Sequence, residues 1–525
     1  MWLTRVFVVF CAIITIAHCS NILVILPTFG PSHFYAFDAL VTGLSNRGHN
    51  ITFMSPLVPK SVKSKNVKHI PLTGDHVDGI TFDILSSHGA GDTDSHAPGF
   101  LSAFAFHNMA MKTCGSVLPT ESVLNTINNT DNKFDIVIVE AFVTDCFAPI
   151  AKEFNASLVL FSTSMLMPWY YDSIGQPDNP AYIPSLMSGV PSKMKFKERV
   201  VNVMVHLWQQ FFRYVFIARF NDVEVKDIYG KPIDSGKLIQ DTSLMLTNTY
   251  FPLNGAFPNV PAKVDIGGIH IGKLKAVPEN IEKWINESKD GVIYFSMGSM
   301  IKGHTFPEEK RKIFLKAFGR LKQRVLWKWE NETMPDKPDN VMIQKWMPQY
   351  DILCHPNVKA FIAHGGLLGT TEAVHCGVPV VVMPQFGDQH TNARALEAGG
   401  GGVVLNFREA DEEMVYNALK TVLDPEFNKK AKELSARFRD RPMSPMDTAI
   451  YWIEYVARHK GAHHMRTAAV GMPLYQYLLL DVFGFLAVCT LSILFIGIYV
   501  TKLFFRLVMS MFSKSDKKQK KLKKN

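Results

Sequence analysis

The chain has 525 residues, of which 47% are apolar and 20% charged, which is enough apolar material for two sizeable cores. Its length exceeds that of one ordinary core, so two domains are expected. The net charge of +9 is concentrated at the ends, because residues 502–525 carry +8 and Arg5 supplies the rest. The body between is formally neutral, so the charge gives no reason to expect a nucleic-acid partner.

The first 20 residues read as a secretory signal peptide. Arg5 precedes an apolar run over residues 6–17, and the small residues Cys19 and Ser20 follow it. The alternative is a first transmembrane helix, but this run is short for a hydrocarbon layer of about 30 Å. Cleavage near Ser20 is therefore predicted.

Residues 21–255 are predicted to form a first α/β domain with a parallel sheet. A loop over residues 28–34 carries His33, and a helix is expected over 35–47. The strands are expected over the following residues: 21–26, 50–55, 135–139, 158–161 and 243–248. A later helical stretch, residues 193–220, mixes basic and aromatic residues; core packing, a membrane surface and an acceptor pocket all remain open for it.

Residues 256–285 are predicted to be a linker, because most of them fall in the stretch 251–278, which is rich in Pro and Gly. A second α/β domain over residues 286–460 follows, because the alternation of strands and helices resumes. Its strands are expected over these residues: 292–295, 325–329, 341–344, 359–363 and 378–383. Two such halves give a ligand cleft at the carboxyl ends of the strands.

Residues 361–389 carry the most specific pattern in the chain, FIAHGGLLGTTEAVHCGVPVVVMPQFGDQ. A strand ends at His364, Gly365 and Gly366 form a turn, and a helix begins whose free N–H groups suit a phosphate. The side chains of His364 and Thr370 add donors, and that of Glu372 accepts from sugar or ribose hydroxyls. After the next strand, the exit loop presents an acid–amide pair that suits sugar hydroxyls, Asp388 and Gln389.

The C-terminal end predicts a membrane anchor. A juxtamembrane segment, residues 461–481, leads to an uncharged apolar run over 482–501, long enough to cross a bilayer. The basic tail that follows, residues 502–525, places this end in the cytosol and gives a single-pass type I topology. Lys521 and Lys523 resemble a dilysine retrieval signal for the endoplasmic reticulum; binding to acidic headgroups is the alternative.

Four cysteines lie outside the signal and the span, and the sequence leaves open how they pair: Cys114, Cys146, Cys354 and Cys376. Glycosylation sequons, each weak alone, fit a lumenal body at these positions: Asn50, Asn128, Asn155, Asn286 and Asn331. No metal is expected. Asp92 and Asp94 match a metal-binding Asp-x-Asp pattern, but they fall in a Gly- and Ser-rich stretch typical of a surface loop.

Residues 361–389 resemble the signature of the UDP-glycosyltransferase family, which includes the animal UDP-glucuronosyltransferases. They depart from it at Ala363, where Thr or Ser is usual, and at Gly369, where Ser is common. The resemblance extends over the chain, from the signal peptide to the lysine tail. It implies a GT-B fold: two Rossmann-like domains facing a cleft, with UDP-sugar in the C-terminal one and the acceptor in the N-terminal one.

The resemblance also assigns roles in the donor site. Trp346 and Gln349 would contact uracil, although a core tryptophan is the alternative for Trp346. Ser299 would meet the phosphates together with His364 and Thr370. Glu372 would bind ribose, and the transferred sugar would contact Asp388 and Gln389. UDP-glucuronate or UDP-glucose would be the co-substrate, with no cofactor.

In the resemblance, His33 is the general base, and a histidine with a pKa near neutrality suits that task. Such a base needs a carboxylate partner. Glu140 stands where the family usually has Asp, and Asp145 is the second candidate. The sequence thus predicts an inverting transferase acting on small lipophilic acceptors, as in detoxification; a non-catalytic binding or receptor protein on the same fold is the alternative. Acceptor identity and homo-oligomerisation stay open.

Overall fold

The computed structural model describes residues 19–59, 63–73, 108–143, 145–186, 188–213, 215, 226, 228–230 and 234–522. The predicted signal run, the Asp92 and Asp94 stretch and the last three residues of the tail lie outside these ranges. The described chain falls into two compact units, divided after Thr467.

The first unit contains two entirely parallel sheets. The first has the order β3-β2-β1-β4-β5-β6-β7. Its strands are β1 (Asn21–Ile25), β2 (Asn50–Ser55), β3 (Val67–Pro71), β4 (Ile136–Glu140), β5 (Ser157–Ser162), β6 (Leu244–Thr247) and β7 (Lys263–Asp265). In register, Ile25 lies beside Val139, so the ends of β1 and β4 meet. The chain reverses its direction of travel across the sheet between these two strands.

The second sheet repeats this plan with the order β10-β9-β8-β11-β12-β13. Its strands are β8 (Val292–Ser296), β9 (Arg324–Lys328), β10 (Val341–Gln344), β11 (Val358–Ala363), β12 (Val380–Val382) and β13 (Gly402–Val404). Ile293 and Phe295 join one buried cluster, whereas Val292 and Tyr294 join another on the opposite face. A parallel sheet covered on both faces explains why these strands read as unbroken apolar runs.

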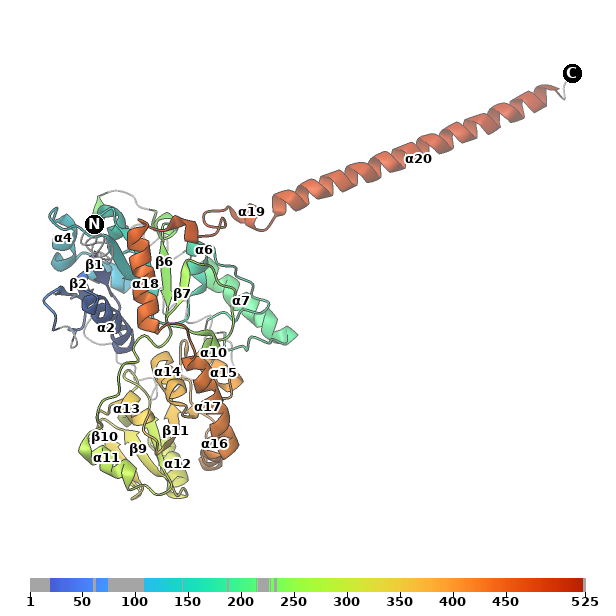
Figure 1. Ribbon diagram of the computed structural model, residues 1–525. Helices are drawn as coiled ribbons and strands as arrows, with labels where there is room; N and C mark the ends of the chain where they lie inside the picture. Colours follow the sequence, from blue (N-terminus) through green and yellow to red (C-terminus); the bar gives the residue numbers. More distant parts are fainter. Residues whose placement is uncertain are drawn as a thin grey trace, which may run out of the picture. The chain divides into compact units, whose positions relative to one another are not determined.

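Helices cover both sheets (Figure 1). In the first half they are α2 (Pro31–Asn46), α4 (Glu121–Asn128), α5 (Pro149–Glu153), α6 (Tyr171–Ile174), α7 (Phe196–Phe212), α9 (Ser235–Ile239) and α10 (Phe251–Asn254). In the second they are α11 (Glu279–Asn286), α12 (Glu308–Gly319), α13 (Gln349–Leu353), α14 (Leu367–Cys376), α15 (Gln389–Ala398), α16 (Glu412–Leu423) and α17 (Pro425–Arg439), and α18 (Pro445–Arg458) follows them in the chain. Short 3₁₀ turns lie at Pro168–Tyr170, Gly303–Thr305 and His463–Met465.

Two boundaries differ from the sequence-based expectation. The predicted linker over 256–285 contains β7, which extends the first sheet. The predicted second domain ends at 460, yet α18 packs on α2, β5, β6 and β7, as Figure 1 also shows. Its buried face includes Ile450 and Ile453, which belong to the first core. The chain therefore returns to the first sheet after completing the second.

The start of α2 also differs. A loop was expected to residue 34, but the helix begins at Pro31 with Gly30 as its N-cap. Proline suits the first position of a helix because its fixed φ is helical and the N–H it lacks would have no helical partner there. His33 therefore lies in the first turn of a helix, which holds its backbone in place.

Two disulfides settle the pairing that the sequence left open. Cys114 pairs with Cys146, and Cys354 pairs with Cys376. The second links the end of α13 to the end of α14.

The second unit contains α19 (Leu474–Tyr477) and the long helix α20 (Leu480–Leu522). Within Leu480–Lys514 of α20, an 18-residue window has a mean hydropathy of 2.4, and none of that window is buried against protein. By length and composition this helix can cross a membrane. It begins close to the predicted span and continues beyond its predicted end at 501.

Candidate active site

The candidate residues lie at the positions where each sheet reverses its strand order. In the first sheet, His33 follows β1 and Glu140 ends β4, and these strands are neighbours. In the second, Ser299 follows β8 and His364 follows β11, which are also neighbours. Ligands of open α/β sheets bind at such reversal points, outside the carboxyl ends of the strands.

His33 and Glu140 form a buried pair. Nδ1 of His33 lies 2.5 Å from Oε1 of Glu140, whose side chain is fully buried while that of His33 remains 19% exposed. Thr163 Oγ1 lies 3.0 Å from the same Nδ1, and the ring of Phe142 packs edge-on at 4.9 Å. Because Nδ1 is held in this way, Nε2 is the nitrogen left for a reacting hydroxyl.

The electrostatics of His33 connect it to the second half of the chain. Burial lowers the pKa of His33, but the charge and hydrogen bond of Glu140, together with the charge of Asp388, outweigh this effect and leave the pKa above its usual 6.5. Burial in turn raises the pKa of Asp388, against the opposing effects of its hydrogen bond from Asn392 and the charge of His33. The predicted base and one predicted sugar ligand therefore interact across the two sheets.

Asp145, the second candidate partner of His33, lies in a different buried cluster. Its Oδ1 accepts a hydrogen bond of 2.9 Å from the hydroxyl of Tyr170, and its Oδ2 pairs with Arg213. Of the two carboxylates named from the sequence, Glu140 is the one in contact with His33. Asp145 instead neutralises Arg213, a buried cation that would be costly without an anionic partner.

His364 is closely packed between two glycines. A Cβ atom at Gly298 or at Gly366 would lie 2.5 Å from the imidazole ring, so neither position has room for a larger residue. Burial, reinforced by the charge of Lys328, lowers the pKa of His364 to about 4. The ring is therefore neutral near pH 7 and keeps one N–H donor, while its buried Nδ1 has no hydrogen-bond partner among the described residues.

The turn after β11 opens α14 as the sequence predicted. Gly365 has φ +85°, a conformation that favours glycine, and Gly366 is the N-cap of the helix. Thr370 is buried one turn into α14, and in the part of the chain that the structure describes its hydroxyl oxygen also lacks a hydrogen-bond partner. Two unpaired polar atoms beside free helix N–H groups suit a bound anion.

Glu372, on α14, contacts two side chains from other segments. Its Oε2 accepts a hydrogen bond of 2.7 Å from Gln349, at the first position of α13. Its Oε1 lies 3.6 Å from Nε2 of His270, a residue of the predicted linker. A Cβ at Gly369 would lie 2.9 Å from Gln349 Nε2, so the glycine at this position leaves room for that amide.

The other predicted donor residues differ in exposure. Trp346 is 63% exposed, which excludes the alternative of a core tryptophan, and Ser299 is also exposed, in the turn after β8. Asp388 is the N-cap of α15, and its Oδ2 accepts a hydrogen bond of 2.8 Å from Asn392. Gln389 is buried, and its Oε1 accepts from the backbone N–H of Gln385 at 2.9 Å, which leaves its Nε2 as a donor.

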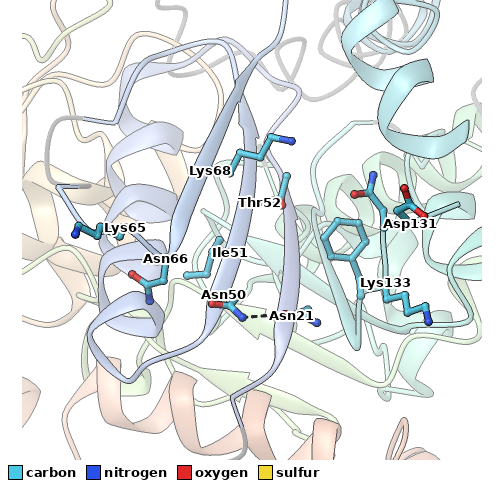
Figure 2. A pocket seen from close by; sticks show the side chains of 11 residues that line it. Asn21, Asn50, Ile51, Thr52, Lys65, Asn66, Lys68, Asp131 and Lys133 are labelled. Atoms are coloured by element: carbon cyan, nitrogen blue, oxygen red, sulfur yellow. Dashed lines mark hydrogen bonds between the residues drawn. The ribbon is translucent and has the colours of Figure 1, made fainter. Parts of the chain in front are cut away.

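A separate hollow of about 500 Å³ lies at the opposite end of the strands of the first sheet (Figure 2). Asn21 and Asn50, the first residues of β1 and β2, line it and are joined by a hydrogen bond of 3.1 Å. None of the candidate donor or catalytic residues lines it. The starts of the strands, where it lies, are the end away from His33 and Glu140, so it is no part of the candidate site.

No cluster of three or more His, Cys, Asp or Glu side chains suited to a metal ion occurs in the part of the chain that the structure describes. Asp92 and Asp94 lie outside that part, so the structure has no bearing on them.

The family of the chain is decided by comparison with known proteins. The family model "UDP-glucoronosyl and UDP-glucosyl transferase" matches residues 21–518, nearly the whole chain. The chain belongs to this family. UDP-glycosyltransferase UGT5 of Dactylopius coccus is 41% identical, over 99% of both chains. UDP-glucosyltransferase 2 of the same species is 38% identical over 98% of both, and human UDP-glucuronosyltransferase 1A8 is 34% identical over 90% of both.

Solved structures show the fold of this UDP-glycosyltransferase. A glycotransferase of kitacinnamycin superposes with a TM-score of 0.57 at 19% identity, covering 83% of this chain and 98% of its own. The calicheamicin glycosyltransferase CalG4 gives 0.54 at 17% identity, covering 84% and 99%. Both have the GT-B fold, in agreement with the two parallel sheets described above. The chain is an enzyme of the glucosyl- or glucuronosyl-transferring type, with a C-terminal helix suited to a membrane anchor.

Proposed function

We propose that this UDP-glycosyltransferase moves glucose or glucuronate to a hydroxyl of small lipophilic acceptors by a single inverting displacement, with His33 as general base. The observation that carries the proposal is the contact between His33 and Glu140 beside the strand reversal of the first sheet. A carboxylate on Nδ1 fixes the ring and stabilises the imidazolium that forms when Nε2 takes a proton.

The reaction then proceeds as one displacement. The acceptor oxygen gives its proton to Nε2 of His33 and attacks the anomeric carbon from the face opposite UDP. The bond between that carbon and the diphosphate oxygen breaks, and its electron pair stays on UDP. Attack from the opposite face converts an α-linked donor into a β-glycoside.

The leaving diphosphate is stabilised by groups that the structure already holds in place. The N-terminus of α14 supplies unpaired N–H groups and a partial positive charge. His364, neutral because its pKa is about 4, donates one N–H, and the unpaired hydroxyl of Thr370 donates another hydrogen bond. Ser299, exposed after β8, contributes a further hydroxyl. Donors fixed in advance need no reorganisation as charge develops on UDP.

The remaining donor contacts follow the same scheme. Trp346 stacks on uracil, because its exposed ring offers a flat apolar face, and Gln349 lies nearby at the start of α13. Glu372 accepts from the ribose hydroxyls. Asp388 and Gln389 bind hydroxyls of the transferred sugar, and the influence of the Asp388 charge on the pKa of His33 supports a sugar position next to the base.

The cellular setting is proposed from the ends of the chain. A signal peptide at residues 1–20, α20 as the single span and the lysine pair near the C-terminus support an enzyme of the endoplasmic reticulum with a lumenal body. Conjugation of lipophilic compounds, as in detoxification, fits an enzyme held at a membrane where such compounds dissolve. Microsomes assayed with radiolabelled UDP-glucose and UDP-glucuronate in parallel identify the donor.

The decisive test is the variant His33→Ala. Turnover with a phenolic acceptor is expected to fall by about 10²–10⁴-fold, which is typical of losing a general base. Binding of UDP, measured by calorimetry, should stay unchanged because the proposed UDP contacts lie in the turns and helices that follow strands of the second sheet. Near-normal turnover in a folded variant that binds UDP would contradict the role of His33, and an α-configured product by NMR would contradict inversion.

A further inference from the structure

His270 is a buried histidine that the proposed mechanism does not use. It lies just after β7, in the segment between the two sheets, and its side chain is only 7% exposed. Both ring nitrogens are buried without a hydrogen-bond partner among the residues that the structure describes. A buried donor left unpaired costs stability, so an imidazole in this state indicates a site that a ligand or a small adjustment completes.

The group that His270 faces is the carboxylate of Glu372. Nε2 of His270 lies 3.6 Å from Oε1, slightly beyond hydrogen-bond distance, and the Glu372 side chain is 13% exposed. The other oxygen, Oε2, already accepts from Gln349 at 2.7 Å. One carboxylate oxygen of Glu372 is therefore hydrogen-bonded, whereas the other has the imidazole of His270 nearby but makes no hydrogen bond with it.

The segment that carries His270 is fixed over α14 by close contacts. Gly267 lies so near the backbone of Thr249 that a Cβ would be 2.5 Å from a carbonyl carbon, and its own carbonyl accepts a hydrogen bond of 2.9 Å from Arg441. Gly268 has φ +89°, and its Cβ position is 3.5 Å from a methyl group of Thr371, the neighbour of Glu372. The backbone before His270 thus has little freedom to move away from α14.

We infer that His270 is a positioning residue for ribose recognition, an inference that rests on the proposed role of Glu372. With a UDP-sugar bound, the imidazole N–H donates to Oε1 while Gln349 donates to Oε2. The carboxylate is then held from both sides, and its remaining lone pairs point toward the 2′ and 3′ hydroxyls of the ribose. The segment between the two sheets thereby contributes to donor selectivity for a ribonucleotide.

The test uses the full-length enzyme in detergent and compares His270→Leu with His270→Gln. The leucine variant is expected to raise the KM for the UDP-sugar about tenfold with little change in kcat, because one hydrogen bond to a charged group is lost. The affinity ratio between UDP and 2′-deoxy-UDP, measured by calorimetry, should fall toward one. Glutamine, whose amide can donate from near the position of Nε2, should restore most of both values.

A matched control is His355→Leu. Its Nε2 lies 3.5 Å from Glu282, in a similar histidine–glutamate pair. Among the described residues, the hydrogen bonds of His355 are with Ile352, Asn357 and Val358, outside the candidate site, so the KM and the affinity ratio should stay unchanged. The inference is overturned if His270→Leu leaves both values unchanged. It is also overturned if His270→Leu weakens the binding of UDP and of 2′-deoxy-UDP equally and His270→Gln does not restore either affinity, since a purely structural role would give that result.

Failure of the proposed function gives a different result. If Glu372 does not bind ribose, the wild-type enzyme itself will bind UDP and 2′-deoxy-UDP equally well, and the inference falls together with that assignment. If His33 is not the base, the His33→Ala variant will turn over normally. The affinities of His270→Leu for UDP and 2′-deoxy-UDP will still decide whether His270 positions Glu372, because binding measurements do not depend on turnover.

Discussion

At the scale of single residues, the carboxylate partner of His33 shows how one side chain sets the working pH. Glu140 is the last residue of β4, and its side chain, fully buried, reaches Nδ1 of His33 directly. The longer glutamate, where the family usually has aspartate, can therefore make this contact. Burial and the charge of Glu140 act on the pKa of His33 in opposite directions, with the charge prevailing together with that of Asp388.

This balance predicts the pH dependence of turnover. A general base must be neutral, so the rate should fall as the pH drops through the raised pKa of His33, giving an acidic limb above pH 6.5 in the wild type. Glu140→Gln removes the main raising charge but keeps the burial, so the limb should move to lower pH. Profiles of kcat/KM against pH for the two proteins measure the shift. A limb that stays in place or moves upward would contradict the pairing.

The same pair makes a pH-dependent contribution to stability. The pKa of His33 is higher in the folded chain than the ordinary value of 6.5, so folding favours its protonated form. That contribution is complete below the unfolded pKa and is lost as the pH rises through the folded pKa. The enzyme therefore reaches its active, neutral state at some cost in stability.

Gly298 predicts a second residue-scale effect. It has φ +80°, and a Cβ there would lie 2.5 Å from the ring of His364, so Gly298→Ala should displace that ring and strain the backbone. We expect a loss of UDP affinity of about tenfold or more, since one charge-assisted hydrogen bond is misplaced. Calorimetry with UDP measures it. Gly319→Ala, where a Cβ meets nothing within 4 Å, is the control, and equal affinities for the two variants would refute the packing argument.

Which site residues the sequence predicts depends on whether they belong to a contiguous pattern. The turn at Gly365 and Gly366 opens a helix as expected, because glycine pairs and helix starts have local signatures. Thr163 and His270 could not be found in this way. Each meets its partner only because segments distant in sequence come together in the fold, and no local pattern records a contact that spans 130 residues, as that of Thr163 with His33 does.

At the scale of elements, the central strands were predicted closely because both of their faces are buried. β4, with the sequence IVIVE, is buried at every position. A short, continuous run of β-branched residues of this kind indicates a buried strand. Three of the four edge strands were missed, whereas the fourth, β10, was predicted at its observed bounds of 341–344. β3 contains a lysine and a histidine and is largely only half-buried, while β7 and β13 have three residues each, too few to show a pattern. Their place in the sheets is set by neighbouring strands rather than by their own composition.

The structure answers only in part whether the helical stretch between 193 and 220 serves core packing, a membrane surface or an acceptor pocket. α7 buries a polar-rich face, in which Asn202 accepts from the N–H of Ser185 and donates to two carbonyls of the same loop. Core packing therefore explains one side of this helix. The opposite side leaves large apolar side chains exposed: Phe196, Val200, Met204, Leu207 and Phe211.

The disulfide between α13 and α14 carries an element-scale prediction. Cys354 and Cys376 join the two helices that present Gln349 and Glu372, whose side chains meet at 2.7 Å. Replacing both cysteines with serine should cost about 3 kcal/mol of stability and also weaken UDP binding, because the helices lose their fixed spacing. Thermal unfolding and calorimetry measure the two effects. Cys489→Ser, a free cysteine in α20, is the control; unchanged UDP affinity in the double variant would show that packing alone holds the helices.

At the scale of the whole molecule, the division into two halves is right in outline and wrong at one end. A boundary at 460 follows from strands and helices alternating without interruption. The return of α18 to the first sheet has no local signal, since any amphipathic helix can cover either sheet. It is stabilised by the buried residues Ala449, Ile450 and Ile453, and the first core therefore closes only after the second sheet is complete in sequence. Folding of the first half is expected to depend on the C-terminal part of the chain.

The last prediction concerns the membrane anchor. A chain that ends after Thr467 lacks α19 and α20 but keeps every donor and catalytic residue, and Thr467 itself donates a hydrogen bond of 2.7 Å to the carbonyl of Gly175. We expect this chain to leave the membrane pellet on washing with alkaline carbonate, while the full-length chain stays, because only α20 is apolar enough among the described helices to span a bilayer.

The affinity of the truncated chain for UDP should equal that of the full-length enzyme. The control keeps α20 and changes Lys521 and Lys523 to serine, and it should remain in the pellet, since the tail lysines are not the anchor. A truncated chain that resists carbonate would show that another segment is integral to the membrane, and a truncated chain that has lost UDP binding would show that the first unit does not fold without the second.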